Sequence, residues 1–189
     1  MGKLRRGFVK EAEQYAAEFR AELGLSSSAP ICPFILLAHL GIPTIGLSKH
    51  PAIPERVKEF FATDGQDDFS ATTLIDGNFK QIVHNDNHHP NRQNSNAAHE
   101  LGHILLGHEA RPPMHESGCR NFDKTLELEA NELGWVILVP KPAAISALQS
   151  FSDLRDAAKF YSVSYQLMQY RVRKSGAENM LRNRKKYRR

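Results

Sequence analysis

Cysteine is scarce in this sequence: Cys32 and Cys119 are the two cysteines among 189 residues. Two cysteines cannot build the disulfide framework on which small secreted domains depend. Cys119 also lacks a second cysteine or histidine at zinc-finger spacing, which disfavours it as a metal ligand. The basic residues 1–10 run into an acidic segment without the apolar core of a signal peptide. We therefore expect a cytoplasmic protein whose two thiols are free.

Long hydrophobic runs are missing as well. The longest apolar stretch, residues 31–47, is interrupted by Pro33, His39 and Pro43, whereas a membrane-spanning helix needs about 20 consecutive apolar residues. No internal repeat is visible. A hydrophobic content of 41% in 189 residues is enough for the core of one domain. The sequence therefore predicts a single domain that does not enter a membrane.

Basic charge is concentrated at the C-terminal end. Residues 171–189 contain nine lysines and arginines against one acid, Glu178, so this segment carries a net charge of +8. The whole chain carries +4, which leaves −4 for the first 170 residues. Such a run is usually a solvated end, and we expect residues 177–189 to be a disordered tail. A basic tail can also make weak, salt-dependent contact with nucleic acid.

Hydrophobic periodicity and turn signals predict helices first, then a small sheet, then more helices. The predicted elements of a domain over residues 1–176 are a helical lead-in (7–41), a sheet (43–85), two central helices (95–107 and 123–139) and a C-terminal helical pair (152–174). Asp76-Gly77-Asn78 is a hairpin turn between two of the predicted strands. This order is typical of an α+β domain in which a small antiparallel or mixed sheet flanks two helices.

The run His99-Glu100-Leu101-Gly102-His103 predicts a zinc site. On a helix, residues four apart share a face, so His99 and His103 can direct two imidazoles at one point. Glu100 is rotated about 100° from His99, and it can instead take a proton from a water at the open position of the metal. Cap candidates at residues 94–96 and Gly107 at the other end support a helix.

A third protein ligand must come from elsewhere in the chain, because open zinc sites use three. His108 is rotated away from the face that His99 and His103 share, and Gly107-His108 does not match the metzincin pattern HExxHxxGxxH. The second central helix, capped by Asp123, carries three glutamates. Glu127 has polar and small neighbours on its face, so we expect it to face solvent. Glu129 and Glu132 face the apolar side, where a carboxylate must be paired or bind a metal, and periodicity leaves both open.

Both central helices resemble the ImmA/IrrE-type metallopeptidases of bacteria and their mobile elements. The likeness rests on the residues AHELGHILLGH at 98–108, on Glu127-Leu128-Glu129-Ala130-Asn131 and on Ile137-Leu138-Val139-Pro140. It extends to the lead-in and C-terminal helices, over about residues 7–176. The resemblance implies a compact zincin-like domain in which Glu129 is the third ligand of one zinc ion, beside His99 and His103. Glu100 would be the catalytic base, and Asn131 would orient a ligand.

The same resemblance implies an endopeptidase that cleaves a specific regulatory protein, such as a transcriptional repressor or an antitoxin. We further expect the extended substrate to pair with the edge strand of the sheet. The alternative is a zinc-stabilised regulatory or DNA-binding module that does not cleave protein. That alternative rests on residues 153–173, whose helix, turn and helix precede the basic tail.

Overall fold

The computed structural model describes residues 3–108 and 123–187 of the chain. Cys119 lies outside these residues, and Cys32 is a free, exposed thiol. The elements, in chain order, are α1 (Phe8–Glu22), α2 (Pro33–His39), β1 (Thr44–Gly46), the 3-10 turn η1 (Leu47–Lys49), α3 (Glu55–Ala62), β2 (Ala71–Asp76), β3 (Phe79–His84), α4 (Pro90–Leu105), α5 (Lys124–Leu138), α6 (Lys141–Ser150), α7 (Leu154–Phe160), α8 (Tyr165–Lys174) and α9 (Ala177–Tyr187). This arrangement confirms the predicted α+β class.

The sheet has three strands in the order β1-β3-β2. β1 runs parallel to β3, with Thr44 opposite Ile82. β2 runs antiparallel to β3, with Thr73 opposite Ile82, and the two strands join through the predicted turn. Gly77 has a φ of +56° in this turn, a backbone conformation that glycine adopts without steric cost. The predicted mixed sheet and its hairpin are therefore confirmed.

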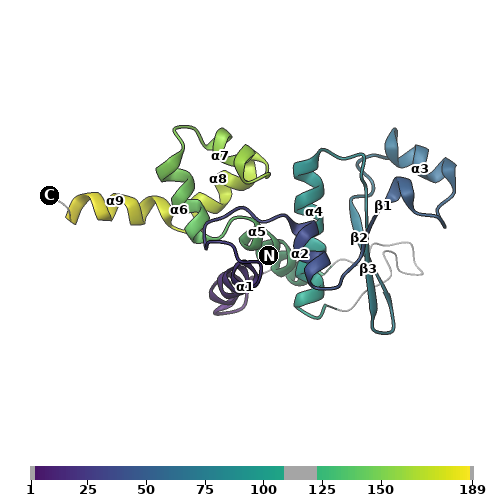
Figure 1. The fold of residues 1–189 in the computed structure, drawn as a ribbon, viewed down its shortest axis with the longest axis horizontal. Coiled ribbons are helices and arrows are strands. Elements are labelled where there is room, and N and C mark those ends of the chain that lie inside the picture. Colours follow the sequence, from purple (N-terminus) through teal and green to yellow (C-terminus); the bar gives the residue numbers. More distant parts are fainter. Residues whose placement is uncertain (1–2, 109–122, 188–189) are drawn as a thin grey trace.

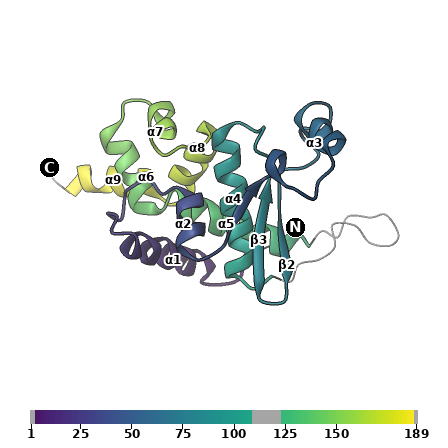
Figure 2. The same cartoon turned by 45° about the vertical axis from the view of Figure 1, so that its right-hand side comes forward.

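Helices α4 and α5 form the centre of the molecule, between the sheet and the C-terminal helices (Figures 1 and 2). Leu101 of α4 and Leu133 and Ile137 of α5 are fully buried in a core that also includes α1, α2 and β3. A second core lies between the end of α5 and helices α6 to α8. Burying both sides of this helix pair fixes α4 and α5 relative to each other.

The motif helix α4 begins earlier than the sequence predicts. It starts at Pro90 rather than at residue 95, and His89 caps it by accepting a hydrogen bond at Nδ1 from the Asn91 amide, 3.2 Å away. Proline is well suited to the first turn because its missing N–H would have no partner there. Asn94, Ser95 and Asn96, predicted as caps, therefore lie inside the helix. Gly107, with a φ of +65°, follows its end as predicted.

The C-terminal part of the described chain differs from the prediction in two places. The predicted helices 123–139 and 152–174 leave no helix between them, whereas α6 begins at Lys141 with Pro142 in its first turn. The Glu13 carboxylate of α1 accepts a hydrogen bond from the Lys141 amide at 2.9 Å, a cap that no local pattern reveals. Residues 177–187, predicted as part of a disordered tail, form α9, and its first residue, Ala177, is fully buried in the second core.

Within the described parts of the chain, no helix combines the length and the apolar character that a membrane crossing requires.

Candidate metal centre

The two histidines of the motif lie one turn apart on α4 and point at the same place. Their Nε2 atoms are 3.1 Å apart, and their ring centroids are 4.6 Å apart. Each side chain is about one-fifth exposed, at 22% for His99 and 20% for His103. Both imidazoles are therefore held by the helix and still reachable from solvent.

Glu127 of α5 completes the cluster. Its Oε2 lies 3.3 Å from His99 Nε2, and its Oε1 lies 3.5 Å from His103 Nε2. Two ligand atoms bound to a tetrahedral zinc ion at about 2.0–2.1 Å lie about 3.3 Å apart. The two Nε2 atoms are separated by about this distance, and each of them has one oxygen of Glu127 at a similar distance. Two imidazoles with one carboxylate are a donor set that zinc accepts. These three residues therefore fit a zinc ion.

Glu129, predicted as the third ligand, does not join this group. Its side chain is 11% exposed, and it lies 3.6 Å from Arg5 Nε and 3.7 Å from His108 Nε2. The other open candidate, Glu132, is fully buried and accepts hydrogen bonds from Arg171 Nη1 at 3.0 Å and from the Tyr170 hydroxyl at 2.7 Å. Its carboxylate is thus committed to a buried ion pair.

The packing of α5 on α4 explains why Glu127, predicted to face solvent, faces the histidines. A Cβ on Gly102 would lie 2.6 Å from the Ala130 carbonyl oxygen, and a Cβ on Gly134 would lie 2.6 Å from that of Ala98. Glu127, Ala130 and Gly134 share one face of α5 because they are spaced by three and four residues. The stripe of small residues that resembles a solvent face is therefore the contact face, and it carries Glu127 to the metal centre.

Hydrogen bonds to His103 and His99 hold the pKa of the Glu127 carboxyl well below its usual range. Burial would lower the pKa of the His99 imidazole, but a hydrogen bond to Glu127 and the charge of Glu100 outweigh burial and raise it. Glu127 is therefore ionised at neutral pH, which is the state in which a carboxylate binds a metal.

Glu100 lies beside this centre and is held by a residue that the sequence analysis does not identify. Its Oε2 accepts a hydrogen bond from the Thr73 hydroxyl of β2 at 2.6 Å. The residue is 9% exposed, so little competing water reaches the carboxylate. Thr73 reaches Glu100 because β2 packs against α4, and no sequence motif marks this threonine.

Asn131 lies one turn after Glu127 on α5. Its Nδ2 donates a hydrogen bond to the Glu127 main-chain oxygen at 2.8 Å, and its carboxamide helps to raise the pKa of His99. His99 Nδ1 itself is buried without a hydrogen-bond partner among the described residues. Asn131 is therefore near both residues, and its orienting role stays a prediction.

The histidines that precede α4 have structural surroundings. His88 is 4% exposed, and its Nε2 lies 2.7 Å from the Gln66 main-chain oxygen. His84 packs against the Phe34 ring, and burial lowers its pKa. His89 caps α4. None of the three belongs to the metal-binding cluster.

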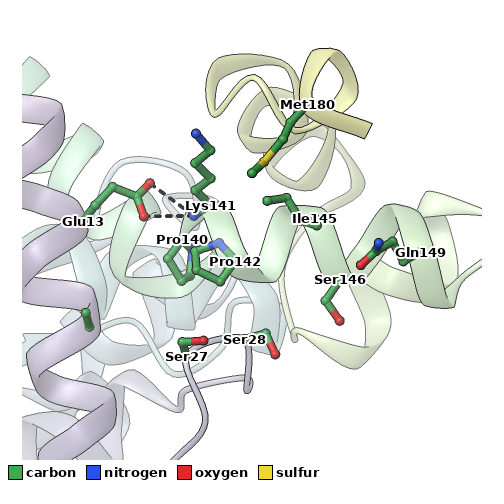
Figure 3. Close-up of a pocket in the computed structure, with 11 residues that line it drawn as sticks. Glu13, Ser27, Ser28, Pro140, Lys141, Pro142, Ile145, Ser146, Gln149 and Met180 are labelled. Atoms are coloured by element: carbon green, nitrogen blue, oxygen red, sulfur yellow. Dashed lines mark hydrogen bonds between the residues drawn. The ribbon is translucent and has the colours of Figure 1, made fainter. Parts of the chain in front are cut away.

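A groove of about 640 Å³ lies elsewhere, between α1, α6 and α9 (Figure 3). Its lining contains no histidine and one carboxylate, Glu13, which faces the Lys141 amide. A groove with this lining offers no set of metal ligands. Among the described residues, the cluster that could hold a metal ion therefore lies on α4 and α5 and not in this groove.

Comparison with known proteins agrees with this location. A peptidase family model described as the IrrE N-terminal-like domain matches residues 52–173. The matched segment includes Thr73, Glu100 and the whole cluster of His99, His103 and Glu127, and it ends inside α8. No curated protein matches the chain.

Proposed function

The chain belongs to the peptidase family whose model is described as the IrrE N-terminal-like domain, and from this membership we propose that it is a zinc-dependent endopeptidase. The observation that carries the proposal is the convergence of His99, His103 and Glu127 within 4.8 Å, with the buried carboxylate of Glu100 on the same helix. A family of metallopeptidases and a zinc-compatible donor set point to the same reaction.

The proposed zinc ligands are His99 Nε2, His103 Nε2 and the carboxylate of Glu127. Glu127 replaces Glu129 in this role because its two oxygens face both imidazoles, at 3.3 and 3.5 Å. Three protein ligands leave one coordination position for water or substrate, as in other catalytic zinc sites. A zinc ion bound there supplies a Lewis acid that polarises the scissile carbonyl and acidifies a water molecule.

Glu100 is the proposed general base. Its carboxylate accepts the proton of the attacking water and returns it to the amine that leaves. The Thr73 hydroxyl occupies Oε2, so Oε1 is the oxygen that remains available for this proton. Thr73 therefore orients the base rather than taking part in proton transfer.

The proposed substrate is an extended segment of a regulatory protein, such as a repressor or an antitoxin, by resemblance to the family. β2 is an edge strand that pairs with β3 alone among the described residues, so its outer edge can accept a peptide strand. Thr73 lies on this strand and contacts the base. Ile75, two residues on and so on the same face of β2, is 42% exposed and can contact an apolar substrate side chain.

Co-expression with the products of neighbouring genes tests the proposal. Mass spectrometry should find fragments of one partner beside the wild-type protein. The Glu100→Gln variant should retain its zinc and cleave at least about 100-fold more slowly, because general bases contribute 10²–10⁴-fold. Undiminished cleavage by this variant would contradict the mechanism.

A zinc-containing DNA-binding module remains the second candidate, because α9 extends from the body of the molecule (Figure 1) with the basic residues of the C-terminal run. Truncation after Leu181 would remove most of this charge and leave the buried Ala177 in place. Salt-dependent DNA binding that this truncation abolishes, without any proteolysis by the full chain, would favour this candidate.

A further inference from the structure

His108 and Glu129 belong to the two sequence motifs but lie outside the zinc-binding cluster. His108 Nδ1 lies 2.9 Å from His103 Nδ1, on the side of the imidazole opposite the cluster. His108 Nε2 lies 3.7 Å from Glu129 Oε2, and Glu129 Oε1 lies 3.6 Å from Arg5 Nε. The side chains of His108 and Glu129 are only 7% and 11% exposed. They therefore form a continuous polar chain behind one candidate ligand.

The order of the partners assigns the protons in this chain. In the proposed zinc site His103 binds the metal through Nε2, so its remaining hydrogen lies on Nδ1 and faces His108 Nδ1 at 2.9 Å. A neutral His108 that accepts this hydrogen at Nδ1 carries its own hydrogen on Nε2, which lies 3.7 Å from Glu129 Oε2. His103 with its hydrogen on Nδ1 keeps the Nε2 lone pair free, and Nε2 is the atom that faces His99 and Glu127.

Arg5 supports the far end of the chain. Two of its nitrogens bind the two oxygens of Glu11, each at 2.7 Å, and the guanidinium lies over the Phe8 ring at 5.1 Å. These contacts fix Arg5 at the start of α1, with Nε directed to Glu129. Arg5 therefore places a positive charge 3.6 Å from one oxygen of the Glu129 carboxylate, whose other oxygen faces His108.

We propose that His108 and Glu129 are positioning residues that orient His103 for zinc binding and set its tautomer. The proposal rests on the proposed function, because it assigns these residues to the same metal centre. Carboxylate and histidine partners of this kind fix the ring of a ligating histidine, and their removal costs about 10–100-fold in metal affinity. Glu129 therefore acts on the zinc ion through His108 rather than as a ligand.

Zinc dissociation constants of the full chain, measured by competition with a chromophoric chelator, test this role. His108→Leu should weaken zinc binding about 10–100-fold. His108→Asn should recover much of that loss, because its carboxamide oxygen can accept from His103 Nδ1. His39→Leu is the matched control: His39 is exposed and pairs with Glu22, so its replacement should leave the zinc affinity unchanged. The melting temperature of each zinc-free variant separates a loss of zinc binding from a loss of fold.

Glu129→Gln provides an independent arm. It should weaken zinc binding by less than His108→Leu, and the double variant should bind zinc as His108→Leu alone does, because Glu129 acts through His108. Additive losses would overturn the proposal. The proposal would also be overturned if His108→Leu bound zinc as tightly as wild type, or if His108→Asn bound zinc as weakly as His108→Leu. A wild-type protein that binds no zinc would overturn the proposed function itself. Zinc binding by the wild-type protein therefore distinguishes a failure of the proposed function from a failure of the positioning role.

Discussion

Three glutamates of α5 lie within six residues and have three different surroundings. Glu127 faces two imidazoles, Glu129 faces His108 and Arg5, and Glu132 is enclosed with Arg171. Burial of a carboxylate next to apolar residues requires a partner, but the partner can be a metal, a histidine or an arginine. Helical periodicity can therefore locate buried carboxylates on α5 without distinguishing their roles.

Thr73 offers a prediction at the scale of one hydroxyl group. Thr73→Val should lower the rate of peptide cleavage about tenfold or more, because a hydrogen bond to a charged group is worth about 1.5–3 kcal/mol. Thr72→Val is the matched control, since the Thr72 side chain lies on the opposite face of β2. Steady-state kinetics on an identified substrate would measure both. A Thr73→Val enzyme as fast as wild type would contradict the orienting role.

At the scale of elements, the contact between α4 and α5 brings the candidate ligands together. Gly102 and Gly134 allow the two backbones to approach where any Cβ would meet a carbonyl oxygen at 2.6 Å. Glycine is normally unfavourable inside a helix by about 1 kcal/mol relative to alanine. Both helices nevertheless have glycine at the positions where they touch. The glycines therefore serve to let the two backbones approach closely.

Replacement of a glycine inside a helix by alanine usually stabilises a protein. At Gly102 and Gly134 we expect it to destabilise the protein instead. Gly102→Ala and Gly134→Ala should each destabilise the protein by about 1–3 kcal/mol, as overpacked sites do. Both should also weaken zinc binding, because α5 must move away from α4 and take Glu127 with it. Urea unfolding and chelator competition would measure the two effects. Stabilisation by alanine would contradict the close approach.

The elements themselves were largely predictable from sequence because their signals are local. The strands at Ala71–Asp76 and Phe79–His84 follow from alternation and a glycine turn, and α5 follows from the Asp123 cap, which accepts from the Thr125 amide at 2.9 Å. Three other features were not predictable from sequence. They are the cap at the start of α6, the orientation of Glu127 toward the histidines, and the hydrogen bond from Thr73 to Glu100. Each depends on a contact between segments distant in sequence.

At the scale of the whole molecule, Arg171 of α8 joins three helices. It is fully buried, donates to Glu132 of α5 at 3.0 Å and to Glu13 of α1 at 2.9 Å, and also donates to the Val139 main-chain oxygen at 2.8 Å. Every nitrogen of the guanidinium thus has an acceptor. This network connects the N-terminal helix and the C-terminal helices to the helix that carries Glu127.

Loss of this arginine should be costly. Arg171→Leu should lower the free energy of unfolding by about 3–5 kcal/mol, because it leaves the buried Glu132 carboxylate without its cation. Arg173→Leu, at an exposed position two residues away on α8, should stay within about 0.5 kcal/mol of wild type. The double variant Arg171→Leu/Glu132→Leu should recover part of the loss. Urea unfolding with equal stability for Arg171→Leu and wild type would contradict the network.

The zinc content of two α5 variants tests the central claim most directly. Elemental analysis after dialysis against metal-free buffer should give about one zinc ion per chain for wild type and for Glu129→Gln, although the latter binds more weakly. Glu127→Gln should lose its zinc, because one of three protein ligands is removed. The reverse result, with zinc retained by Glu127→Gln and lost by Glu129→Gln, would contradict the assignment of the metal centre.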